Sequence, residues 1–74
     1  MADDAGLQRD LDELDAQINE LRQYIDGLRL QLRSDGAQDS EDIAASLTNI
    51  EENEGALSAL EARRERLRAR LGQS

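Results

Sequence analysis

Seventy-four residues leave room for one small domain. The chain has no Cys and no His, and all nine of its basic residues are Arg, which excludes disulfides, thiolate or imidazole metal sites and Schiff-base chemistry. Seventeen acidic residues give a formal net charge of −8, and no apolar run approaches the length of a membrane span. We therefore expect a cytoplasmic, non-catalytic protein with no cofactor, no metal and no direct contact with nucleic acid or membrane.

Composition also favours helices over strands. Pro is absent, and Ala, Leu, Gln, Glu and Arg, all good helix formers, dominate the chain. Twelve Leu and four Ile supply nearly all of the large apolar side chains. In so short a chain, burying them offsets the conformational entropy of folding only narrowly. We therefore expect the protein to associate with itself, at least as a dimer.

The first predicted element is a helix over about residues 4–33. Its apolar residues are spaced alternately four and three residues apart, which is the heptad pattern of a coiled coil. They are Leu7, Leu11, Leu14, Ile18, Leu21, Ile25, Leu28 and Leu32. The stretch 34–39 contains Ser, Asp and Gly and predicts a turn.

The second predicted element is a helix over about residues 40–71, with a less regular apolar seam. Ile43, Ile50, Leu57 and Leu71 keep one phase of the heptad, and Leu60 and Leu67 keep the other. Ser46, Asn53 and Arg64 interrupt this seam, and Leu47 lies beside it. We interpret Asn53 and Arg64 as residues that fix register or partner choice, because polar side chains at seam positions have that effect.

Charge predicts how the two helices lie. Residues 1–15 carry six acids and one Arg, whereas residues 62–74 carry five Arg and one Glu. An antiparallel arrangement sets these oppositely charged ends side by side, and a short connection also favours antiparallel neighbours. Two registers match the seams: Leu28 against Ile43, or, one heptad away, Leu7 against Leu71.

The sequence thus predicts an all-α fold, an antiparallel two-helix coiled-coil hairpin. A second apolar stripe of Tyr24, Leu30 and Leu47 favours its dimerisation into a four-helix bundle. The expected function is that of a protein–protein interaction or adaptor module, with itself and another protein as partners. The expected interaction seam is Leu14, Ile18, Leu21, Ile25, Leu28, Leu47, Ile50, Leu57 and Leu60.

The start of the second helix suggests an alternative function. Residues 39–44, DSEDIA, spell D-x-x-D-x-A at the turn of the hairpin. This resembles the coiled-coil tip of DksA/TraR-type factors, which enter the secondary channel of bacterial RNA polymerase, and Gre-type factors carry a related acidic tip. The stretches LQRDLDEL (7–14) and LEARRERL (60–67) are also similar to the arms of these factors.

The resemblance implies a transcription regulator with RNA polymerase as its partner. Asp39, Asp42 and Ala44 then correspond to the tip residues that approach the polymerase active centre. The likeness covers only the arm, because the zinc-binding Cys cluster of the DksA/TraR group and the globular domain of the Gre group are absent. Asp, Ser and Glu are also ordinary capping residues at a helix start, so the acidic stretch has two interpretations.

Overall fold

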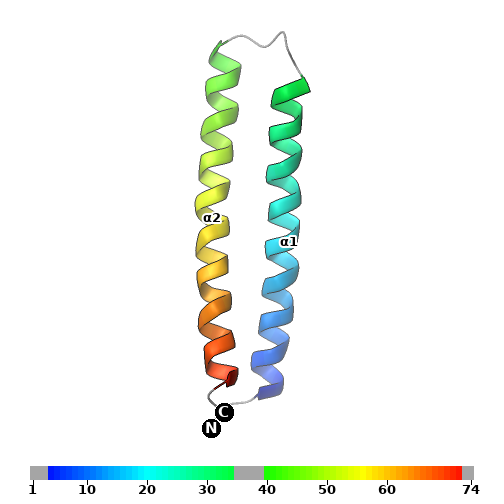
Figure 1. Ribbon diagram of the computed structural model, residues 1–74, viewed down its shortest axis with the longest axis vertical. Coiled ribbons are helices and arrows are strands. Elements are labelled where there is room, and N and C mark those ends of the chain that lie inside the picture. Colours follow the sequence, from blue (N-terminus) through cyan, green and yellow to red (C-terminus); the bar gives the residue numbers. More distant parts are fainter. Residues whose placement is uncertain (1–3, 35–39, 73–74) are drawn as a thin grey trace.

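The chain forms a hairpin of two long helices. The computed structural model describes residues 4–34 and 40–72. Helix α1 spans Asp4–Ser34 and helix α2 spans Ser40–Gly72. The two helices run antiparallel, with the start of α1 and the end of α2 at the same end of the molecule (Figure 1). We call that end the termini end, and the opposite end, where α1 finishes and α2 begins, the turn end.

Each helix continues one residue beyond its predicted end. A shift of this size is within the usual uncertainty of helix boundaries, where the last turn frays. Charges at the helix ends match the helix dipoles: Asp4, Glu41 and Asp42 lie in first turns, and Arg33 and Arg70 in last turns. The remainder of the predicted turn, residues 35–39, lies outside the described residues.

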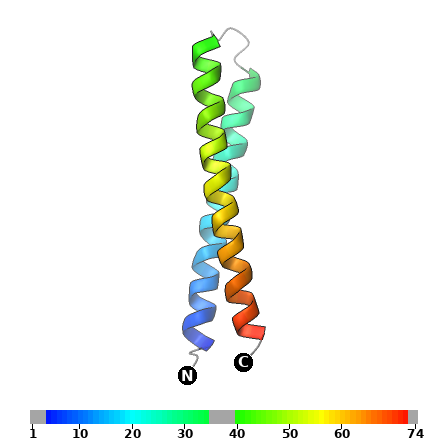
Figure 2. The same ribbon diagram turned by 90° about the vertical axis from the view of Figure 1, so that its left-hand side faces the viewer.

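The core is the apolar seam of α1 packed against α2. Buried side chains are Leu7, Leu11, Leu14, Ile18, Ile25, Ile50 and Leu67, with Leu57, Leu60 and Leu71 packed at the edge of the main cluster. That cluster lies toward the termini end. The molecule is slender, 56 Å long and 15 by 13 Å across, and α1 and α2 cross at a shallow angle (Figure 2).

Ion pairs between the helices define the register. Arg22 of α1 pairs with Glu61 of α2 at 2.6 Å, and one heptad further along α1, Arg29 pairs with Glu54 at 2.8 Å. The partner therefore moves back by one heptad as α1 advances by one, as antiparallel packing requires. Leu71 packs against the cluster that contains Leu7. Of the two registers open to the sequence, the structure adopts the one that matches Leu7 with Leu71.

Candidate interaction surface

The nine residues of the expected interaction seam fall into two groups. Leu14, Ile18, Ile25 and Ile50 are buried, and Leu21, Leu28, Leu57 and Leu60 are half-buried. These eight side chains are largely used to hold the hairpin together. Leu47 differs, because 46% of it is exposed. The part of the seam that is open to another molecule is therefore near the turn end.

Leu47 lies in a shallow, mainly apolar hollow between the helices. Leu32 of α1 and Leu47 and Ile50 of α2 form its floor, and the hollow has a volume of about 330 Å³. Its rims are Arg29 and Arg33 on α1 and Glu51 and Glu54 on α2. The two rims thus carry opposite charges.

A second hollow continues the first toward the termini end. It shares Arg29 and Glu54 with the first hollow, and Ile25 and Leu57 supply its apolar side chains. Arg22 and Asp26 complete its lining. We call the two hollows together the groove. Its α1 rim carries Arg22, Arg29 and Arg33 together with one acid, Asp26. Its α2 rim carries Glu51 and Glu54, and Glu61 joins this rim through its ion pair with Arg22.

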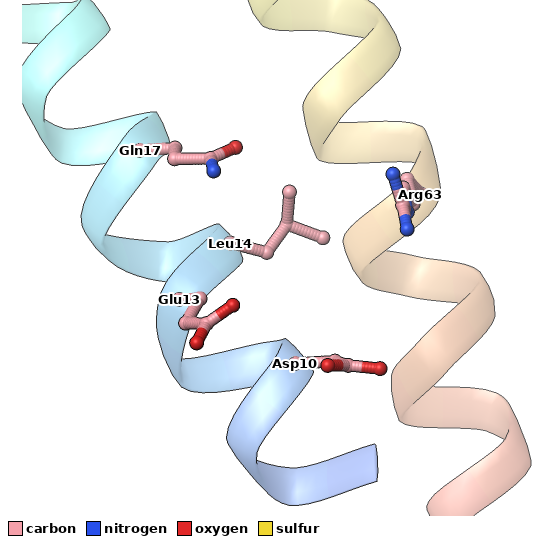
Figure 3. A pocket seen from close by; sticks show the side chains of 5 residues that line it. All are labelled: Asp10, Glu13, Leu14, Gln17 and Arg63. Atoms are coloured by element: carbon pink, nitrogen blue, oxygen red, sulfur yellow. The ribbon is translucent and has the colours of Figure 1, made fainter. Parts of the chain in front are cut away.

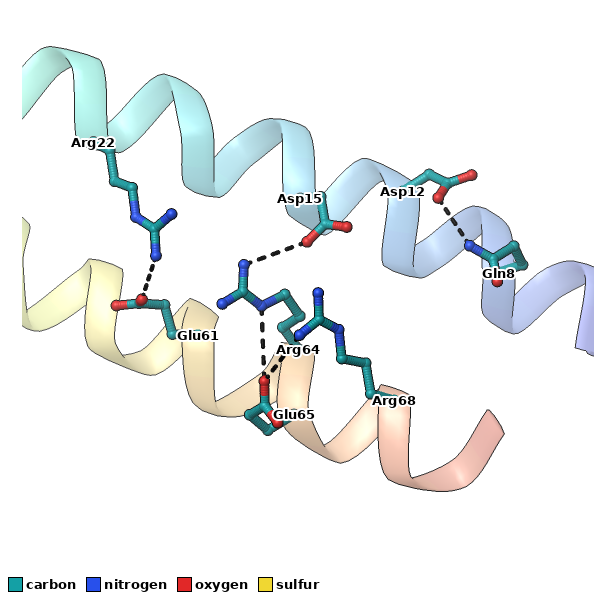
Figure 4. A network of polar contacts seen from close by, with 8 residues as sticks. All are labelled: Gln8, Asp12, Asp15, Arg22, Glu61, Arg64, Glu65 and Arg68. Carbon is teal, nitrogen blue, oxygen red and sulfur yellow. Dashed lines mark hydrogen bonds and ion pairs between the residues drawn. The ribbon is translucent and has the colours of Figure 1, made fainter. Parts of the chain in front are cut away.

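Beyond the groove, a network of charged side chains crosses the interface (Figure 4). Arg64 interrupts the α2 seam and reaches Asp15 of α1 at 3.5 Å. Glu65 contacts Arg64 at 4.0 Å and Arg68 at 3.3 Å. Asp15 Oδ1 and Arg64 Nε are buried without a hydrogen-bond partner among the described residues. The contact between Asp15 and Arg64 is therefore an ion pair that lacks good hydrogen-bond geometry.

Asn53, the other residue expected to fix the register, is satisfied within its own helix. Its Nδ2 donates to the backbone oxygen of Asn49 at 2.8 Å and to Asn49 Oδ1 at 2.9 Å. The side chain is half-buried. Asn53 therefore places a polar amide at the seam without needing a partner on α1.

A small polar hollow lies at the termini end (Figure 3). Asp10, Glu13 and Gln17 project from α1 and Arg63 projects from α2, while Leu14 points between the helices. The volume of this hollow is about 110 Å³. Substrate pockets usually enclose about 300–1,000 Å³ and are mostly apolar. The hollow is therefore a gap between charged surface side chains rather than a pocket for a small molecule.

The structure describes two of the three proposed tip residues. Asp42 and Ala44 are exposed in the first turns of α2, at the turn end. Asp39 lies outside the described residues. Within residues 4–34 and 40–72, no group of three or more acidic side chains is arranged to hold a metal ion.

Sequence reasoning missed the groove and grouped its residues differently. It placed Tyr24, Leu30 and Leu47 in one apolar stripe. All three are exposed, but only Leu47 lines the groove. The signal that would have indicated the groove is the pairing of Arg on α1 with Glu on α2, as in Arg22–Glu61 and Arg29–Glu54. These pairs can be recognised only once the register is known.

Neither described helix contains a stretch long and apolar enough to cross a membrane. No protein-family model, curated protein or solved structure matches the chain.

Proposed function

We propose that the hairpin is a non-catalytic protein-interaction module that binds other helices through the groove. The observation that carries this proposal is the exposure of Leu47 beside Leu32 and Ile50, with Arg on one rim and Glu on the other. An amphipathic helix binds such a surface by burying its apolar face in the groove. The charged rims then select partners that carry both signs of charge.

The proposal includes self-association into a four-helix bundle. The apolar side chains near the turn end, Ile43 and Leu47, are exposed in the single hairpin. Burying a Leu or Ile side chain completely is worth roughly 1.5–3 kcal/mol. Association through this half of the hairpin therefore stabilises a fold whose main cluster lies toward the other end.

A capture experiment with matched variants tests the proposal. Wild type, Leu47→Asp and Leu30→Asp serve as immobilised baits, with helicity of each checked by circular dichroism. Leu30 is the control because it is 62% exposed on α1 but does not line the groove. We expect partners to bind wild type and Leu30→Asp and to be lost by Leu47→Asp. Partners that bind all three baits equally would place the interaction outside the groove.

The second candidate function is insertion of the turn end into RNA polymerase. Its support is the exposure of Asp42 and Ala44 at one end of a rod 56 Å long. The double variant Asp39→Asn/Asp42→Asn, used as a fourth bait, separates the two functions. Polymerase subunits that bind wild type and are lost by a fully helical double variant would favour the tip. A partner retained by that variant and lost by Leu47→Asp would favour the groove.

A further inference from the structure

The groove concentrates positive charge that the rest of the central hairpin lacks. Residues 16–61 carry ten acids and only three bases, Arg22, Arg29 and Arg33. All three of these Arg line the groove. The other faces of this part of the molecule therefore present acidic groups without basic ones. Two copies of a chain with net charge −8 approach most favourably where positive groups are available.

The groove, with its largely basic rim on α1 and its acidic rim on α2, is complementary in charge to the groove of a second copy. Arg22 and Arg29 lie level with Glu61 and Glu54, since each pair is joined by an ion pair. A twofold axis parallel to the helices, running along the groove, lays α1 of one copy over α2 of the other at the same height. Arg29 of each copy then lies over Glu54 of the other. This symmetry turns each ion pair into a square of four alternating charges.

The apolar floor of the groove fits the same arrangement. Leu32 and Leu47 line one hollow from opposite helices, so they lie at similar heights. The twofold axis places Leu47 of each copy against Leu32 of the other.

From this self-complementarity we infer that the groove is a homodimer interface, in which two hairpins pack groove to groove with their turn ends together. The inference rests on the proposed function and names a second copy of the chain as the occupant of the groove. An interface of this type is isologous, because the same patch is used by both copies. It predicts a four-helix bundle in which α1 of one copy lies over α2 of the other.

The first test is the oligomeric state of purified protein, measured by analytical ultracentrifugation at about 100 μM. We expect wild type and Leu30→Asp to sediment as dimers and Leu47→Asp to sediment as a fully helical monomer. The substitution replaces an apolar side chain of the groove floor with a carboxylate and removes the contact between Leu47 of each copy and Leu32 of the other. A monomeric wild type, or a dimeric Leu47→Asp, would overturn the inference. A monomeric wild type would also remove the self-association part of the proposed function, whereas the binding of other proteins is decided separately by the capture experiment.

The second test uses a charge-reversed variant, Arg29→Glu/Glu54→Arg. It keeps an ion pair between positions 29 and 54 within each hairpin. Under the proposed symmetry it also keeps opposite charges facing each other between two copies of the variant. A mixed dimer with wild type instead sets Arg29 over Arg at position 54 and Glu54 over Glu at position 29. Native mass spectrometry of an equimolar mixture, with one species ¹⁵N-labelled, measures the mixed fraction after unfolding and refolding. We expect it to fall from the half given by random pairing to below about a tenth.

Random pairing would overturn the proposed symmetry. The alternative symmetry has its twofold axis perpendicular to the helices and lays α1 over α1 and α2 over α2. In that arrangement, exchanging the charges at positions 29 and 54 creates no systematic repulsion between wild type and variant in a mixed dimer. If the first charge-reversed variant loses helicity, Arg22→Glu/Glu61→Arg provides the same test one heptad away. Both variants preserve the amino-acid composition and the net charge, so a failure to mix reports the arrangement of charges alone.

Discussion

Replacing Arg64 by Leu tests how a charged residue is accommodated at a seam position. In the observed register Arg64 lies level with Leu14, which is buried. The side chain of Arg64 is 18% exposed, and its Nε is buried without a hydrogen-bond partner among the described residues. The side chain of its ion partner Asp15 is 38% exposed although its Oδ1 is buried, so only part of the Asp15 carboxylate remains in contact with water when the guanidinium is removed.

The magnitude follows from three contributions. The Asp15–Arg64 ion pair is partly solvated and is worth about 0–1 kcal/mol. Removing the buried, unpaired Nε relieves a desolvation cost of roughly 1–3 kcal/mol. Burying a Leu is worth roughly 1.5–3 kcal/mol, but the aliphatic stem of Arg64 already covers part of the same surface. We expect Arg64→Leu to raise the free energy of unfolding by about 1–2 kcal/mol.

Urea denaturation followed by circular dichroism measures this change. For an m-value of about 1 kcal/mol per molar urea, the midpoint should rise by about 1–2 M at a fixed protein concentration. The control Asp15→Ala leaves the guanidinium of Arg64 with only its 4.0 Å contact to Glu65 and should lower the midpoint. A lower midpoint for Arg64→Leu would show that the ion pair stabilises the hairpin more than an apolar side chain does, and would refute the reasoning.

Three further predictions use the same urea assay. Ile18→Ala should lower the free energy of unfolding by about 2–4 kcal/mol, because this side chain is fully buried. The control Leu30→Ala should change the free energy of unfolding by less than about 0.5 kcal/mol. Equal effects of the two substitutions would contradict the assigned core. Asn53→Leu should raise the free energy of unfolding by about 1 kcal/mol, since the amide occupies a half-buried seam position. A decrease would mean that the hydrogen bonds from Asn53 to Asn49 stabilise the hairpin more than an apolar side chain does. Gly27→Ala and Gly55→Ala should each stabilise by about 0.5–1 kcal/mol, because a Cβ meets nothing within 4 Å at either site; a loss would point to a contact outside the single hairpin.

The sequence predicted α1 better than α2 because the two seams differ in regularity. The unbroken spacing from Leu7 to Leu32 specifies both the helix and the face that it buries. In α2, polar residues at positions 46, 53 and 64 leave the seam ambiguous, and among residues 41–72 only Ile50 and Leu67 are buried. The groove could not be predicted from the sequence, because its floor and rims combine residues of both helices. Which residues lie together depends on the register, and the ambiguous α2 seam leaves the register open.

The two registers are close in hydrophobic energy because a shift of one heptad restores the pattern. In the observed register the matched apolar positions are Leu7 with Leu71, Leu11 with Leu67, Ile18 with Leu60, Leu21 with Leu57, and Leu28 with Ile50. The shifted register matches Leu11 with Leu60, Leu14 with Leu57, Leu21 with Ile50, and Leu28 with Ile43. The difference is a single apolar layer, so hydrophobic burial alone separates them by only a few kcal/mol.

Charges beside the seam widen this gap. In the observed register Arg22, Arg29 and Asp15 each lie near a residue of opposite charge. A shift of one heptad keeps Arg22 opposite an acid, Glu54. It sets Asp15 level with Glu61, a like-charge pair, and sets Arg29 level with Leu47, which leaves its guanidinium without the acid that it has in the observed register. Each exposed pair is worth little in isolation, about 0.2–1 kcal/mol, but the shift converts attraction into repulsion at one site and removes attraction at another. The charged residues beside the seam therefore favour the observed register, and the groove exists only in that register.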